Sequence, residues 1–335
     1  MTIASKAKHL ISFILLAFLV LPAQALGPAA RAEPVEVRSA ALDLDVATPA
    51  QRRLGRLDYL GGLILASEDG GFGSYSGMAV DADGGGLWAV SDTGHWLRLD
   101  FRLAADGLPA DIAKAEIQPL RDARGAAISS KALSDAEGLR RLPDGRWLVS
   151  FERAHRLWFY DAPGGAATGT LSVPAGLAQQ PANGGIEALA AFRNGDLLLL
   201  SEDMAVAATG AQPAGHAAWL WRDGAWRDAI WPARDDFKPT DAVALDNGDA
   251  IVLERYFSPL VGPKARLQRL RATTWQAGQL QPELLAEWAR PLSVDNMEAL
   301  DARRMPDGSL WLYVMSDDNQ NPLQRTLLMV FRLAE

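Results

Sequence analysis

The sequence predicts an all-β protein with the architecture of a β-propeller. Apolar residues alternate with polar ones along many short segments, which is the period of a pleated strand. Turn signals such as Pro143-Asp144-Gly145 and Asn194-Gly195 separate these segments. The same unit of strand, glycine-containing turn and strand returns roughly every 50 to 60 residues, a spacing typical of radial repeats. Repeated small antiparallel sheets indicate propeller blades.

Five such repeats are visible. Their first strands and turns share a small residue, an apolar run and an Asp-Gly or Asn-Gly pair, and they cover residues 76–84, 137–145, 187–195, 241–248 and 298–308. A second strand follows each turn. Third strands are expected at residues 96–101, 156–160, 217–221, 266–270 and 326–333. Each repeat is therefore an antiparallel sheet of at least three strands.

The last repeat stops near the end of the chain after three strands. We expect an N-terminal strand, either Val35–Leu44 or Arg56–Leu65, to complete its sheet and close the ring. We expect six blades, with five as the alternative, because the chain length at this spacing suits both. We also expect residues Lys114–Ala132 to form an inserted loop.

The N-terminus has the pattern of a secretory signal peptide. Lys6 and Lys8 precede the apolar run Leu10–Leu21, and Ala23-Gln24-Ala25 offers an A-x-A cleavage step. We expect cleavage after Ala25, a single domain over residues 26–335, and a periplasmic or secreted protein that uses the general secretory route. No stable membrane anchor is expected after cleavage.

The composition of the chain excludes several classes of partner and of reaction chemistry. The 335 residues carry a formal net charge of -8, and nucleic-acid binding needs basic patches, so no nucleic-acid partner is expected. There is no cysteine, which excludes disulfides, thiol catalysis and thiolate metal sites. Any metal must therefore have oxygen or histidine ligands.

Polar residues recur where the first strand of each repeat begins. Aligning the repeats places Ser76, Glu137, Glu187, Asp241 and Glu298 in one column. The innermost strand of a blade starts beside the central channel, so these side chains should gather at one mouth of it. Four carboxylates so close repel one another unless protons or a cation compensate. Glu137, Glu187, Asp241 and Glu298 are thus candidate ligands of a divalent cation, with Ca²⁺ as the first candidate ion.

A second group of candidates opens the third strands. His95, His155 and His216 fall there. Antiparallel pairing brings the start of a third strand to the same face as the start of the first. Alternatively, the charged residues at strand ends are simply solvated. This interpretation stays open for the residues at the starts of both the first and the third strands. The chain has no G-x-S-x-G elbow, H-E-x-x-H, P-loop or G-x-G-x-x-G motif.

At these residues the sequence resembles the family called phytase-like, or "esterase-like activity of phytase", of exported bacterial proteins. The matching segments include "FGSYSGMAVD", "SDAEGLRRLPDGRWLVSFERAHRLW", "GGIEALAAFRNGDLLLLSED", "PTDAVALDNGDAIVLERYFS" and "DNMEALDARRMPDGSLWLYVMSDDN", within residues 72–319. The resemblance implies a propeller-like fold and a hydrolase that acts on ester or phosphoester bonds of a small molecule. The family is distinct from the calcium-rich β-propeller phytases, so calcium is suggested by analogy.

The first functional hypothesis is a metal-assisted hydrolase. The cation would polarise a phosphoryl or carbonyl oxygen. His155 or His95 would act as the general base, and Ser76 beside His95 is a candidate nucleophile. Arg153, Arg255 and His216 are candidate substrate-binding residues. The alternatives are a lactonase-type metal-dependent propeller and a non-catalytic periplasmic propeller that binds a ligand or serves as a scaffold.

Overall fold

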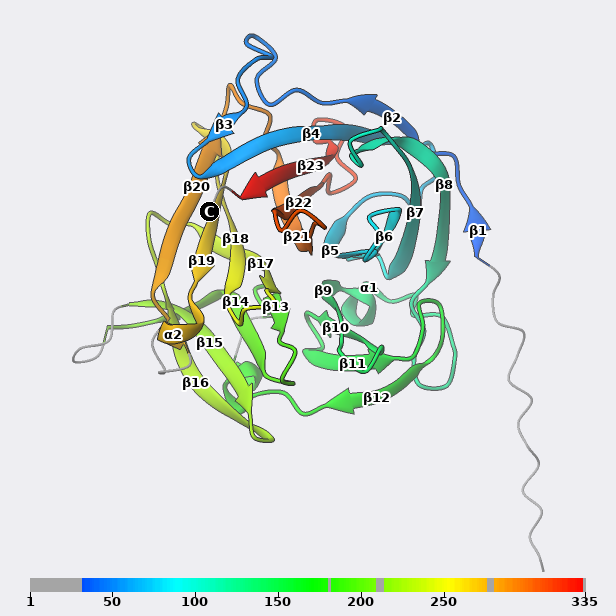
Figure 1. Ribbon diagram of the computed structural model, residues 1–335. Helices are drawn as coiled ribbons and strands as arrows, with labels where there is room; N and C mark the ends of the chain where they lie inside the picture. The colour runs from blue at the N-terminus through cyan, green and yellow to red at the C-terminus, as the bar shows by residue number, and fades with distance from the viewer. Residues whose placement is uncertain (1–31, 180–181, 209–213, 276–279, 334–335) are drawn as a thin grey trace, which may run out of the picture.

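Five antiparallel sheets surround a central channel in the computed structural model (Figure 1). The structure describes residues 32–179, 182–208, 214–275 and 280–333. One innermost strand of each sheet faces the channel: β5 (Tyr75–Val80), β9 (Ala136–Arg141), β13 (Ile186–Ala191), β17 (Lys238–Ala244) and β21 (Asn296–Arg304). The predicted β-propeller is confirmed, but the expectation of six blades is wrong and the alternative of five is correct. The expected signal peptide, residues 1–25, lies outside the described residues.

The first two blades follow the predicted repeats. Blade 1 continues outwards through β6 (Gly86–Ser91), β7 (His95–Leu103), β8 (Pro109–Pro119) and the short β1 (Glu33–Pro34). Blade 2 continues through β10 (Trp147–Phe151), β11 (Arg156–Tyr160) and β12 (Ala167–Leu171). The expected inserted loop at Lys114–Ala132 is wrong in its first part, because Lys114 to Pro119 belong to β8 and pair with β7.

Blades 3 and 4 have four strands each. Blade 3 adds β14 (Leu197–Val206), β15 (Gly215–Arg222) and β16 (Ala225–Pro232) to β13. Blade 4 adds β18 (Ala250–Ser258), β19 (Gly262–Leu270) and β20 (Pro282–Ala289) to β17. Helical structure among the described residues is limited to short turns: α1 (Lys131–Ser134), the 3-10 turn Ala175–Gln179 and α2 (Ala272–Trp275).

Blade 5 joins the two ends of the chain. Its strands β22 (Leu310–Asp317) and β23 (Thr326–Leu333) come from the C-terminal repeat, and β4 (Leu57–Ala66) pairs with β23 from Leu57↔Leu333 to Leu65↔Thr326. The predicted closure by an N-terminal strand is confirmed. Further out, β2 (Arg38–Ala41) and β3 (Arg53–Leu54) both pair with β4. From residue 32 onwards, the N-terminal region therefore widens blades 1 and 5 and forms no sixth blade.

The hydrophobic core is divided among the five contacts between neighbouring blades. Each of the five buried clusters draws its residues from two adjacent sheets. Between blades 1 and 2, for example, Trp96 packs edge-on against Trp147, with ring centroids 6.0 Å apart, and against Tyr160 at 5.5 Å. Such packing fixes each inner strand relative to its neighbours. The channel is therefore a position where side chains from five blades meet with defined geometry.

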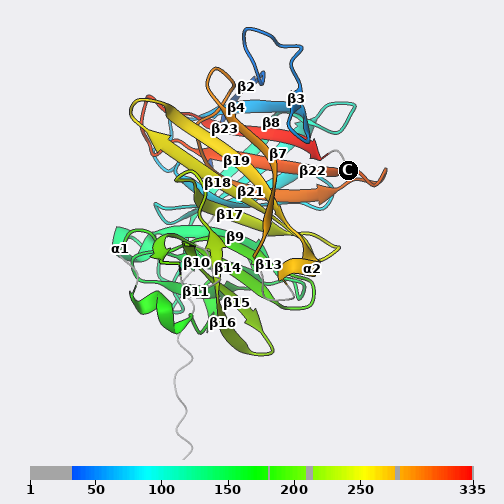
Figure 2. The same cartoon turned by 90° about the vertical axis from the view of Figure 1, so that its left-hand side faces the viewer.

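We call one side of the ring the mouth face. Inner strands begin there, second strands end there and third strands start there, because neighbouring strands are antiparallel. In the side view of Figure 2, α1 and the tip of the β18–β19 hairpin both lie at this side, and α2 lies at the other. None of the helices in the described part of the chain is both long and apolar enough to cross a membrane.

Candidate functional site

Each inner strand has an irregular pairing near its mouth end. In β5, Tyr75 pairs with Ser91 and Gly77 with Val90, so Ser76 is the extra residue of a β-bulge. Glu187 and Glu298 occupy the same bulge position in β13 and β21. A bulge re-aims the side chain of the unpaired residue. In each of these strands, the side chain of the bulged polar residue therefore points in a different direction from the one that strict alternation along the strand would give it.

The small residue after the bulge is required by the neighbouring blade. A Cβ atom on Gly77 would lie 2.6 Å from the backbone nitrogen of Leu139 in the next inner strand. A Cβ on Gly138 would lie 3.1 Å from the Leu189 Cβ of the next inner strand, and 2.7 Å from Ser150 Oγ of its own blade, to which the Gly138 N–H donates. The column of small residues seen in the sequence thus lets inner strands approach closely around the channel.

Blade 4 departs from this pattern by one residue. Pro239 pairs with Glu254 and Asp241 with Leu253, so the extra residue is Thr240 and Asp241 takes a regular paired position. The Asp241 side chain is fully buried, accepts a hydrogen bond from the Leu300 N–H at 2.7 Å, and forms an ion pair with Arg140. The contacts of Asp241 therefore do not support its predicted role as a ligand of the same cation as Glu137, Glu187 and Glu298. An alignment by residue type missed the one-residue shift.

Arg140 closes the central channel. Its guanidinium, from β9, donates to a backbone carbonyl of the inner strand of every blade, namely those of Met78, Leu139, Leu189, Ala242 and Leu300. The equivalent residues of blades 1 and 3, Ala79 and Ala190, are small and leave room for it. This role was not predictable from the sequence, because an arginine near the end of a strand is usually exposed. Arg140 therefore separates the carboxylates at the mouth face from the other end of the channel, where Asp301 lines a second cavity.

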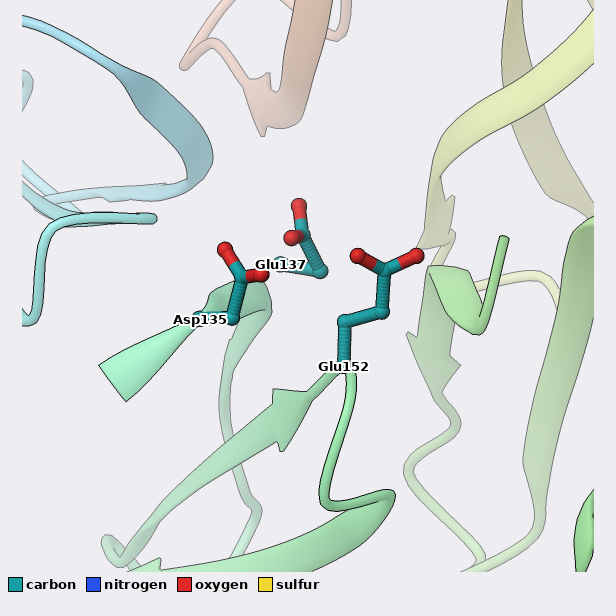
Figure 3. Close-up of side chains that lie close together, drawn as sticks. All are labelled: Asp135, Glu137 and Glu152. Atoms are coloured by element: carbon teal, nitrogen blue, oxygen red, sulfur yellow. The ribbon is translucent and has the colours of Figure 1, made fainter. Parts of the chain in front are cut away.

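Above Arg140 lies a group of eight carboxylates that we call the acidic mouth. They come from the starts of the inner strands and the ends of the second strands: Asp92, Asp135, Glu137, Glu152, Glu187, Glu202, Glu298 and Asp317. In Figure 3, the side chains of Asp135, Glu137 and Glu152 point towards a common space. One carboxylate oxygen from each of these three lies within 4.8 Å of the other two.

Burial makes negative charge costly in the acidic mouth. It raises the pKa of Glu137 well above its usual value, and the charges of Asp135 and Glu152 raise it further. Burial likewise raises the pKa of Glu187, followed by the charges of Glu137 and Glu202. Burial raises the pKa of Glu298 to about 8, although the charge of Arg255 acts in the opposite direction. The group therefore favours protons or a bound cation.

Cationic side chains compensate only part of this charge. Arg255 lies 2.7 Å from Glu202 and 2.9 Å from Glu298, measured between nitrogen and oxygen. Asp135 contacts Lys131 through one oxygen and Arg153 through the other, each at 2.5 Å. Within the described part of the chain, Glu137 and Glu187 have no hydrogen bond or ion pair, although they are only 8% and 7% exposed. Two nearly buried carboxylates are thus left without a protein partner.

A pair of glycines anchors Glu152. The N–H groups of Gly184 and Gly185 both donate to Glu152 Oε1, the second at 2.9 Å. A Cβ on Gly185 would lie 2.8 Å from the His155 ring, which places His155 beside Glu152. His155 therefore lies next to Glu152, which is one of the three acids labelled in Figure 3.

The other predicted catalytic and binding residues lie elsewhere on the mouth face. His95 Nδ1 is 3.2 Å from Thr93 Oγ1, and burial lowers the pKa of this histidine. Among the described residues no hydrogen bond joins Ser76 to His95, so the expected nucleophile–base pair is not formed. His216 has Nδ1 at 2.8 Å from the Glu202 carbonyl and Nε2 at 3.2 Å from the Phe237 carbonyl. Both of its ring nitrogens therefore face backbone carbonyl oxygens.

The donor set of the acidic mouth fits a hard divalent cation. Carboxylate oxygens are the ligands that Ca²⁺ and Mg²⁺ prefer, and Glu137 provides a nearly buried carboxylate that has no hydrogen bond or ion pair among the described residues. Asp135 was missed in the sequence because it precedes the aligned column by two positions. Its only signal was its place between Ser134 and the first residue of the inner strand.

The family of this chain follows from its match to a family sequence model. The sequence model of the family described as "Phytase-like: Esterase-like activity of phytase" matches residues 70–320, most of the chain. The chain belongs to the phytase-like family. The match covers the inner strands of all five blades and therefore every residue of the acidic mouth.

Solved structures similar to this phytase-like chain share little sequence with it. The structure titled "Structure of U3-55K" has a TM-score of 0.41 and 11% identity, over 78% of this chain and 96% of that one. The RRP9 WD40 repeats give 0.42 and 12%, over 79% and 96%. A protein of unknown function from Bacteroides caccae gives 0.41 and 11%, over 83% and 82%. No curated protein matches the sequence.

Proposed function

We propose that this phytase-like propeller is an exported hydrolase of ester or phosphoester bonds and that the acidic mouth is its reaction site. Family membership supports the hydrolase class. The site is proposed because two nearly buried carboxylates, Glu137 and Glu187, have no hydrogen bond or ion pair within the part of the chain that the structure describes. Six further acids lie beside them. Folding tolerates such a concentration of charge only if something compensates it.

A divalent cation is the proposed compensation, with Ca²⁺ as the first candidate. Glu137, Glu152 and Asp135 would hold it, with Glu187 and Glu298 beside them. When bound, a hard cation supplies Lewis-acid polarisation of a carbonyl or phosphoryl oxygen. It would also reverse the local electrostatics, so that an anionic substrate is attracted to a site that otherwise repels it.

The chain's own residues have distinct proposed roles. Arg255, held between Glu202 and Glu298, offers donors to an anionic group of the substrate. His155, beside Glu152, accepts a proton from the attacking water through its imidazole ring. Arg153 orients Asp135 through their ion pair and serves the substrate only indirectly. Arg140 blocks the channel below, so substrate enters and product leaves by the mouth face.

The test joins metal content to activity. The purified protein is desalted, its metal content is measured, and aryl esters, aryl phosphates and lactones are screened as substrates with and without added Ca²⁺. Glu137→Gln should weaken cation binding and lower hydrolysis, each by about tenfold to a hundredfold. Asp228→Asn is the matched control, because Asp228 is an exposed carboxylate on the outer strand β16. Retained metal with no hydrolysis of any substrate would instead support a funnel that only binds a ligand.

Export is proposed on the N-terminal pattern and tested separately. Residues 1–25 are proposed as a signal peptide that is cleaved after Ala25, leaving a periplasmic or secreted domain over residues 26–335. Mass spectrometry of the protein from the expressing cells should find Leu26 at the N-terminus.

A further inference from the structure

An apolar hairpin tip stands beside the acidic mouth. Strands β18 and β19 are paired without interruption as far as Ser258↔Gly262. Phe257 near the end of β18 and Leu260 and Val261 in the connection have 63%, 98% and 51% of their surface exposed. Figure 2 shows this hairpin reaching the same side of the ring as α1. Three large apolar side chains within five positions form a patch that water solvates unfavourably.

Strand geometry directs part of this patch towards the site. Arg255 and Phe257 are two residues apart in a strand whose register has no bulge, so their side chains lie on the same face. Arg255 uses that face to contact Glu202 and Glu298 of the acidic mouth. Tyr256, between them, lies on the opposite face and packs against Phe237, with ring centroids 5.8 Å apart. Phe257 therefore extends the wall of the acidic mouth outwards with an apolar surface.

The tip is ordered before any ligand arrives. The Val261 N–H donates to Ser258 Oγ at 3.2 Å, and Gly262 has a φ of 83°, which a residue with a side chain adopts only with strain. A preformed apolar surface loses little conformational freedom on binding.

We propose that the β18–β19 hairpin tip binds the apolar part of the substrate, so that the substrate is an amphiphile: an ester or phosphoester that carries a medium-length alkyl or aryl group. This inference rests on the proposed function and names its substrate class. The polar, reacting end would lie at the acidic mouth and the apolar end against Phe257, Leu260 and Val261. A membrane surface fits less well, because the net charge of -8 repels a layer of anionic headgroups.

The binding experiment needs no turnover. Calorimetry measures the affinity of butyl, hexyl and octyl chains on two non-hydrolysable heads, a phosphonate in the presence of Ca²⁺ and a trimethylammonium group, all below their micelle concentrations. Each added methylene that is buried should tighten binding about twofold to fourfold on either head. The double variant Phe257→Ser/Leu260→Ser should remove this dependence on chain length. Leu284→Ser is the matched control, because Leu284 is an exposed leucine on the outer strand of the same blade.

The outcomes separate this inference from the proposed function. A dependence on chain length that the double variant loses supports the inference, even if no ester is hydrolysed and the proposed function fails. Equal affinities for all chain lengths overturn it, even if nitrophenyl butyrate and octanoate are both hydrolysed. Binding to zwitterionic lipid vesicles but not to monomeric amphiphiles, or a wild-type dimer that the double variant breaks, would assign the tip to a membrane or to a second copy and would also overturn it.

Discussion

The guanidinium of Arg140 and the carboxylate of Asp241 form a buried ion pair across the channel, joining blade 2 to blade 4. Both side chains are almost inaccessible, and Asp241 also accepts from the backbone N–H groups of Leu300 and Ala242 at 2.7 and 2.8 Å. Removing one charge of such a pair leaves the other without compensation. Substitution of either residue should therefore destabilise the folded ring.

Arg140→Met should destabilise the protein by about 3 to 5 kcal/mol, because it leaves the Asp241 charge and five inner-strand carbonyls without their shared donor. Denaturant unfolding followed by tryptophan fluorescence measures the change. Arg146→Met is the control; its ion pair with Asp144 is exposed, and its loss should cost less than about 1 kcal/mol. A cost below 1 kcal/mol for Arg140→Met would contradict the role of the arginine in holding the ring.

Stability should fall as pH rises from about 4.5 to about 8 in the absence of divalent cations. Burial raises the pKa of Glu298 to about 8 and that of Asp317 to about 7, whereas both groups titrate near their usual values of 4.5 and 3.8 in the unfolded chain. In this window the folded state binds more protons than the unfolded state, so raising the pH favours unfolding. Carboxylates with lowered pKa values, such as Asp58 and Asp111, act in the opposite direction but only at lower pH.

Melting temperatures at pH 5 and pH 8 in the presence of a chelator check this dependence. Glu298→Gln should reduce the difference between them, because the glutamine does not titrate. Melting temperatures that rise with pH across this range would show that the acidic mouth is already compensated by protein groups.

A divalent cation should stabilise the folded protein and flatten the same pH dependence. A ligand bound only by the folded state adds RT ln(1 + [L]/Kd), roughly 2.7 kcal/mol at a hundredfold excess over Kd. Glu187→Gln should keep the fold and weaken the gain from Ca²⁺ or Mg²⁺, whereas Asp228→Asn should leave it unchanged. Thermal unfolding with chelator and with each ion measures the gain. Superimposable curves at both pH values would remove the cation from the site.

Gly184→Ala should cost more stability than Gly195→Ala. Both glycines have positive φ, 111° and 88°, but an added Cβ on Gly184 would lie 2.3 Å from Asp203 Cβ while Gly195 has open space around it. The Gly195 variant should lose about 1 kcal/mol from backbone strain alone. The Gly184 variant should lose about 2 kcal/mol or more and also bind cations more weakly, since the Gly184 N–H holds Glu152. Equal losses would mean that this loop adapts freely.

The strands and turns were predictable because their signals are local. Alternation identified the second and third strands, and the missing fourth strand of the last repeat correctly indicated closure by an N-terminal strand. Two candidates stayed open, Val35–Leu44 and Arg56–Leu65, and the structure shows that the second pairs with β23. The number of blades was not predictable in the same way. The segments around Arg38 and Leu57 have the composition of strands, and nothing in their pattern distinguishes two outer strands of blade 5 from a blade of their own.

The sequence predicted the column of polar residues at the starts of the inner strands, but not the contacts that each of them makes. Glu137, Glu187 and Glu298 lie in the acidic mouth, but Asp241 differs because a bulge moved to Thr240, and a bulge leaves no mark on the order of apolar residues. Arg140 could not be foreseen either, since its partners are backbone carbonyls from five separate repeats. Side-chain patterns carry no information on such contacts.

The pairing of β4 with β23 places a constraint on the order of folding. Leu57 is among the first residues of the described chain to be synthesised, and its partner Leu333 is among the last. Until β23 is available, β4 offers an unpaired edge that can join another chain, and such long-range pairing is slow. Substitutions in β23 should therefore appear first as aggregation of newly made protein, before any loss of stability is measurable in molecules that have completed the ring.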